Sequence, residues 1–116
     1  MATVREPVRL GVLISGRGTN LQAIIDAVEG GELRAEIRIV VSNRAGARGL
    51  ERAHKHQINT RIIRNRDFLS REDFDRALVD VLKANGVELV VCAGFMRLLS
   101  PVMLSEFPNR IMNIHP

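Results

Sequence analysis

Aromatic residues and cysteine are scarce in this 116-residue chain. It has no tryptophan or tyrosine, and its four phenylalanines offer few of the stacking surfaces that nucleic-acid-binding proteins often use. The arginines are scattered and form no basic stripe, so the formal net charge of +4 indicates anionic small ligands or solubility and no nucleic-acid partner. The single cysteine, Cys92, excludes an internal disulfide framework and is expected to be a buried core residue.

Long apolar runs are also missing. No segment is long enough to cross a membrane, and no secretory signal is visible in residues 1–7, so the sequence predicts a cytoplasmic protein without a membrane partner. No metal is expected either, because His54 and His56 lie two apart on a predicted helix and point to different sides. With 46% apolar and 26% charged residues, the composition is typical of one soluble globular domain.

The most informative segment is residues 8–29, where an apolar run passes through a glycine loop into an amphipathic helix. Gly16 and Gly18 allow the backbone to approach a ligand closely. Thr19 or Asn20 can cap the helix, whose positive end then points at the loop. A phosphate group is the expected ligand, although a turn of this kind can also bind nothing.

The same loop departs from the nucleotide-binding fingerprints. Leu21 occupies the position where a dinucleotide fold has its third glycine, and the second strand, 37–41, ends without the carboxylate that would hold a ribose. No Gly-Lys-Ser/Thr sequence follows the loop. The loop therefore favours a small phosphate ester over NAD or ATP.

Strands and helices alternate along the chain. The predicted strands are 9–14, 36–42, 59–63 and 87–92, and the predicted helices are 20–29, 47–56 and 71–84. Such alternation predicts an α/β fold, a Rossmann-like parallel sheet with helices on both faces and strand order 3-2-1-4. Ligands then collect between the first and fourth strands, where the loops 15–19 and 93–99 should face each other. On the third helix, Asp73, Asp75 and Arg76 are expected to form a solvated, charge-paired face.

The segment after the fourth strand, 94–99, is apolar except for Arg97, and Ser100-Pro101 predicts a short helix behind it. Its extended backbone could hydrogen-bond the edge of a flat, pterin-like heterocycle. Alternatively, Met96, Leu98 and Leu99 simply seal the sheet edge.

At the chain's end, strand periodicity places Asn113 and His115 on one face, with Ile114 on the other. An amide and an imidazole this close together can both donate to one developing oxyanion, as acyl or formyl transfer requires. A histidine in this position can equally belong to a solvated tail.

Five blocks, in order, are LISGRGTNLQAII, VVSNRAGARGLERA, SREDFDRAL, CAGFMRLLSP and MNIHP. Together they resemble the phosphoribosylglycinamide formyltransferases, folate-dependent enzymes of purine biosynthesis that use 10-formyltetrahydrofolate as formyl donor. The resemblance spans nearly the whole chain. It implies a formyltransferase fold acting on small-molecule substrates, and a homodimer is compatible with it.

The resemblance also implies roles for individual residues. Gly18, Thr19 and Asn20 would hold the phosphate and ribose of the ribonucleotide. The folate pocket would be formed by Arg71, Met96, Arg97, Leu98, Leu99 and Asn113. Asn113 would also bind the formyl group, and His115 would be the catalytic residue.

Family members continue well beyond this chain and supply a downstream aspartate that pairs with the histidine. Residues 1–116 are therefore expected to be the N-terminal part of a single formyltransferase domain, without its C-terminal part and inactive alone. Two other functions remain open: a formyltetrahydrofolate deformylase, which would use water where the transferase uses an amine, and a non-catalytic phosphate-binding module.

Overall fold

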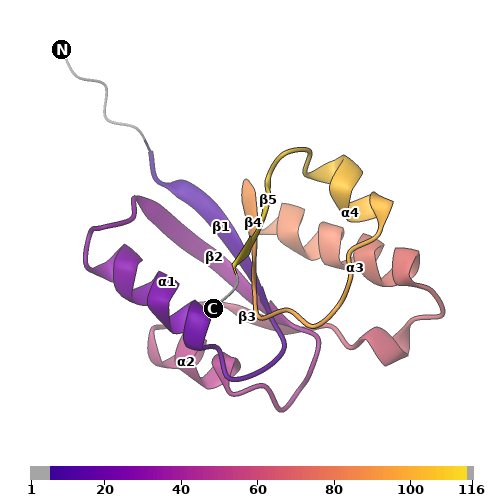
Figure 1. The fold of residues 1–116 in the computed structure, drawn as a ribbon, viewed down its shortest axis with the longest axis horizontal. Coiled ribbons are helices and arrows are strands. Elements are labelled where there is room, and N and C mark those ends of the chain that lie inside the picture. The colour runs from indigo at the N-terminus through magenta and orange to yellow at the C-terminus, as the bar shows by residue number, and fades with distance from the viewer. Residues whose placement is uncertain (1–5, 115–116) are drawn as a thin grey trace.

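In the computed structural model, which describes residues 6–114, five parallel strands form one sheet with helices packed on both faces (Figure 1). The strands are β1 (Val8–Ile14), β2 (Ala35–Ser42), β3 (Thr60–Ile62), β4 (Leu89–Ala93) and β5 (Ile111–Ile114). The helices are α1 (Thr19–Glu29), α2 (Gly49–Lys55), α3 (Arg71–Ala84) and α4 (Pro101–Glu106), with a 3-10 turn, η1 (Asn65–Asp67). The predicted α/β class is confirmed. Among the described residues, no helix combines the length and apolar character needed to span a membrane.

The strand order is β3-β2-β1-β4-β5, which confirms the predicted order and adds β5 outside β4. Every pairing is parallel, with Val12 of β1 opposite Val91 of β4 and Cys92 of β4 opposite Asn113 of β5. Because parallel strands end at the same edge, the loops that follow β1 and β4 meet there. The order therefore brings together the two loops between which the sequence predicts a ligand.

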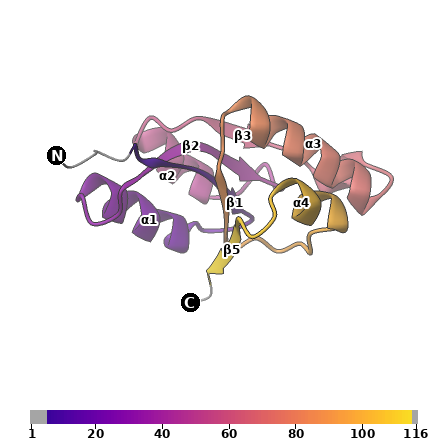
Figure 2. The same ribbon diagram turned by 90° about the horizontal axis from the view of Figure 1, so that it is seen from above.

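The core lies on both faces of the sheet, as the apolar strands predicted. Leu10, Val12 and Ile14 of β1 pack toward α1 and α2, while Leu13 packs toward α3 and α4. In the view from above, α1 lies on one side of the sheet and α3 with α4 on the other (Figure 2). Burial on both faces explains why these strands contain no polar alternation.

The predicted caps hold at two helices and fail at one. Ser70 Oγ accepts a hydrogen bond from the Asp73 backbone N–H (3.1 Å), and Ser100 Oγ accepts one from that of Val102 (3.3 Å). At α1, however, the predicted cap by Thr19 or Asn20 is wrong: the N-cap residue is Gly18, with φ of 76° and no side-chain cap. The first turn of α1 consequently keeps N–H groups free for a ligand.

The prediction of a solvated charged face on α3 is wrong for Asp75, whose exposed fraction is 0%. Its Oδ2 accepts a hydrogen bond from the Ser100 backbone N–H at the start of α4. Packing of α4 against α3 supplies this donor in place of water, while Asp75 Oδ1 is buried without a hydrogen-bond partner among the described residues. Asp75 therefore fixes the end of the segment that leads from β4 to α4.

Candidate active site

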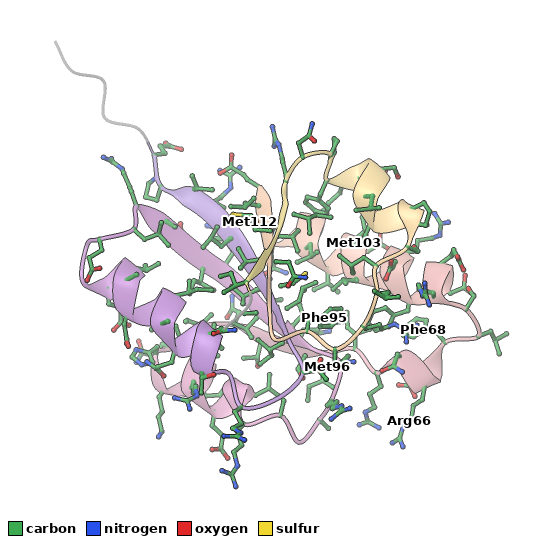
Figure 3. All side chains as sticks on the ribbon, in the orientation of Figure 1. Arg66, Phe68, Phe95, Met96, Met103 and Met112 are labelled. Carbon is green, nitrogen blue, oxygen red and sulfur yellow. The ribbon has the colours of Figure 1, made fainter. Side chains whose placement is uncertain are left out.

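A pocket of about 480 Å³ lies where the loops after β1 and β4 meet. Its lining residues come from the glycine loop with the start of α1, from the loop after β4 and from β5; they are Gly16, Arg17, Gly18, Thr19, Asn20, Ala93, Gly94, Phe95, Met96, Asn113 and Ile114. Phe95 and Met96 lie next to each other in the loop after β4 (Figure 3). The predicted meeting of the two loops is therefore confirmed.

The glycine loop is held against α2. A Cβ atom on Gly18 would lie 2.5 Å from Cα of Gly49, so both positions need glycine for the segments to pack this closely. The Gly49 N–H donates to the Gly16 carbonyl (3.0 Å), and Arg52 Nε donates to the Arg17 carbonyl (2.8 Å). These contacts hold the loop, with Arg17 in the pocket wall and no acidic residue in the first turn of α1, in a form suited to an anion.

Two consecutive hydrogen bonds connect the loop after β4 with the loops after β1 and β2. The Met96 N–H donates to Ser15 Oγ (2.8 Å), and the Ser15 hydroxyl donates to Asn43 Oδ1 (2.6 Å). Ser15 is 2% exposed and Asn43 7%. Ser15, Asn43 and Gly49 were not predicted from the sequence. For the first two, the available signal was a polar residue at the carboxyl end of an apolar strand.

The segment predicted to bind folate divides into two kinds of residue. Met96 and Leu98 are 74% and 73% exposed, so they do not seal the sheet edge, whereas Leu99 packs against the core and does. The Arg97 guanidinium lies 4.7 Å from the centre of the Phe74 ring, and its buried Nε has no hydrogen-bond partner. Of these residues, only Met96 lines the pocket of about 480 Å³.

Arg71 is the exposed first residue of α3 and does not line this pocket. Its predicted peripheral contact with folate is neither supported nor opposed by that position. Phe68 and Phe74, which lie on either side of it in the sequence, form an edge-to-face pair with ring centres 5.8 Å apart. This aromatic pair anchors the beginning of α3 below Arg97.

Asn113 lies on β5, opposite Cys92 of β4, and lines the pocket with its exposed side chain. The other predicted catalytic residue, His115, lies outside the described residues. Cys92 is buried as predicted, and burial raises the pKa of its thiol to about 11. A thiol with this pKa stays protonated near neutral pH, which makes it a poor nucleophile.

Each of the two remaining histidines contacts one polar side chain. His54 Nε2 lies 3.0 Å from Thr60 Oγ1, and His56 Nδ1 lies 2.7 Å from Glu29 Oε2. Between residues 6 and 114, no three His, Cys, Asp or Glu side chains gather in a metal-binding arrangement.

Comparisons with known proteins agree with this architecture. The sequence matches the formyl transferase family over residues 8–116. It is 48% identical over 105 residues to the phosphoribosylglycinamide formyltransferase of Escherichia coli, covering 90% of this chain and 50% of that protein. It is also 47% identical over 110 residues to the trifunctional purine biosynthetic protein adenosine-3 of Chironomus tentans, covering 93% of this chain and 8% of that protein.

Among solved structures, the glycinamide ribonucleotide transformylase 1 of Symbiobacterium toebii superposes with a TM-score of 0.92 at 49% identity. That match covers 96% of this chain and 52% of the other. The chain thus spans about half the length of its single-function relatives and a small share of the trifunctional ones. The family match over residues 8–116, with the shared parallel sheet, shows that this chain belongs to the formyl transferase family.

Proposed function

We propose that the protein transfers a formyl group from 10-formyltetrahydrofolate to the amine of phosphoribosylglycinamide. The observation that supports this most directly is the single pocket onto which the glycine loop, Met96 and Asn113 converge. Two substrates must meet for a group transfer, and one wall of this pocket suits an anion while the other is apolar. The relatives named for this reaction share the fold around the pocket.

The phosphate and ribose of the ribonucleotide would bind at Gly18, Thr19 and Asn20. The first turn of α1 presents free backbone N–H groups there, because Gly18 caps the helix without a side chain. Arg17 lines the same wall and adds positive charge. With its phosphate held at this end of the pocket, the substrate would direct its amine toward Asn113.

The folate would lie along the segment 96–99, with its pterin against the exposed side chains of Met96 and Leu98. Arg97 would contribute to the folate pocket from its place over Phe74, and Arg71 would contact the folate more peripherally. The backbone of this segment is anchored at both ends, by the Met96 N–H to Ser15 and the Ser100 N–H to Asp75. This anchoring would keep the segment extended and ready to pair with a heterocycle.

In the reaction, the substrate amine attacks the formyl carbon, and the tetrahedral oxyanion is stabilised by donors from Asn113 and a protonated His115. The attacking nitrogen then loses a proton, the folate nitrogen receives one through His115 or water, and the bond between the folate nitrogen and the formyl carbon breaks. Preorganised donors of this kind typically lower the activation free energy by about 3 kcal/mol each. We place this chemistry in the cytoplasm, on soluble small molecules and with no metal, and a homodimer is compatible with it.

The test uses the protein at its natural length with 10-formyltetrahydrofolate and phosphoribosylglycinamide. Asn20→Ala should raise the KM for the ribonucleotide, Asn113→Ala should mainly lower kcat, and His115→Ala should abolish transfer. Asn59→Ala, at an exposed site that does not line the pocket, is the matched control and should retain wild-type rates. Formate release that does not need the ribonucleotide would indicate a deformylase, and silence in both assays would leave a binding module.

A further inference from the structure

A second pocket, of about 500 Å³, lies at the carboxyl ends of β2 and β3. Its lining residues are Asn43, Arg44, Ala45, Arg64, Asn65 and Arg66, none of which lines the pocket between the glycine loop and β5. Arg66 extends from η1 into solvent, on the side of the molecule away from α1 (Figure 3). We call this feature the arginine pocket.

The arginine pocket carries three positive charges and no carboxylate in its lining. Within residues 6–114, none of its three guanidinium groups pairs with a carboxylate, whereas Arg9 and Arg38 pair with Glu88 and Glu36. Asp67 follows Arg66 directly in the sequence but does not line the pocket. Three arginines in one pocket lining, none of them paired with a carboxylate in the part of the chain that the structure describes, favour a multiply charged anion.

The two asparagines contribute amide N–H donors to the pocket lining. The Ser15 hydroxyl oxygen accepts from the Met96 N–H, and the hydroxyl donates its own proton to Asn43 Oδ1 (2.6 Å), which orients the Asn43 amide. Asn43 Nδ2 then donates to Asn65 Oδ1 (3.3 Å). Each of the two amide oxygens thus accepts a hydrogen bond, and the amide N–H groups that have no acceptor within residues 6–114 can donate to a ligand.

We propose that the arginine pocket is a second anion site and that it binds a diphosphate group. Three guanidinium groups match the charge of about −3 that a diphosphate carries near neutral pH, and a monophosphate would leave them unbalanced. The guanidinium groups come from two separate loops, Arg44 from the loop after β2 and Arg64 with Arg66 from the segment around η1. A ligand with two phosphoryl groups can bridge both loops, which one carboxylate cannot.

The test is titration of the ¹⁵N-labelled, natural-length protein with inorganic pyrophosphate, followed by NMR at low salt. We expect saturable shifts of the Asn43 and Asn65 side-chain amides. The double variant Arg64→Gln/Arg66→Gln should weaken binding at least about tenfold, since two charge-assisted contacts are lost. The matched control is Arg34→Gln/Arg61→Gln, which removes the same charge from exposed residues outside both pockets and should change the affinity less than about twofold.

A parallel titration with ADP separates a free diphosphate from one carried by a nucleoside, because tighter binding of ADP would assign the site to a nucleotide. An equal loss in the control double variant would overturn the proposal, since it would show that net charge alone attracts the anion. The absence of saturable shifts at Asn43 and Asn65 would also overturn it. These readouts need neither substrate of formyl transfer, so they stand or fall independently of the proposed reaction.

Discussion

Replacement of Gly18 by alanine tests the contact between the glycine loop and α2. The new Cβ would lie 2.5 Å from Cα of Gly49, which is about 1 Å closer than carbon atoms normally approach, and the neighbour is backbone that cannot rotate away. The φ of 76° adds a second cost of about 1 kcal/mol for a residue with a Cβ. Relief of the clash would move the loop and break the 3.0 Å hydrogen bond from the Gly49 N–H to Gly16.

Together these effects should cost about 3 kcal/mol, since overpacking alone typically costs about 1 to 3 kcal/mol. That is a large part of the stability of an ordinary domain, and it should lower the urea midpoint by about 1.5 M if the m-value is about 2 kcal/mol/M. Phosphate-ester binding should also weaken, because Gly18 lines the pocket. Urea unfolding monitored by circular dichroism measures the loss of stability, and titration with the phosphate ester at low urea measures the loss of binding.

Gly46→Ala is the matched control, because a Cβ there would meet nothing within 4 Å and its φ is not positive. It should be neutral, or stabilising by up to about 1 kcal/mol through the unfolded chain. If Gly18→Ala unfolds at the same urea concentration as Gly46→Ala, the packing explanation for the glycine loop is wrong. Loss of binding without loss of stability would also contradict it.

Three further predictions follow from buried groups. Asp75→Ala should lower the free energy of unfolding by about 2 to 3 kcal/mol in urea titrations, because the Ser100 N–H loses its acceptor in the core. A loss below about 0.5 kcal/mol, which is typical of substitutions at exposed positions, would refute this. Ser15→Ala should destabilise by about 1 to 3 kcal/mol and speed hydrogen exchange at the Met96 amide, and unchanged exchange would show that the hydrogen bond does not hold the loop. The Cys92 pKa of about 11 keeps the thiol neutral at pH 8, so a thiol reagent should react at the unfolding-limited rate, and prompt reaction in native buffer would contradict the burial.

Features that depend on neighbours in sequence were predicted well. The caps at Ser70 and Ser100 join residues two or three apart, and the glycine loop is one continuous segment. The strand order followed from alternation and the handedness of crossovers. The predicted α1 cap is wrong because Thr and Asn are common capping residues at any helix start. In the structure the helix begins one residue earlier, after Gly18, which has a left-handed φ and packs against α2.

The sequence by itself determined the parallel sheet, the glycine loop and the meeting of the two loops at the carboxyl edge, because these follow from hydrophobic periodicity and local backbone chemistry. Only the tertiary structure decided which polar groups are buried there. Ser15 reaches Asn43 across 28 residues and Met96 across 81, and Asp75 reaches Ser100 across 25. Burial of a polar group is costly without a hydrogen-bond partner, and the identity of a distant partner cannot be read from spacing along the chain.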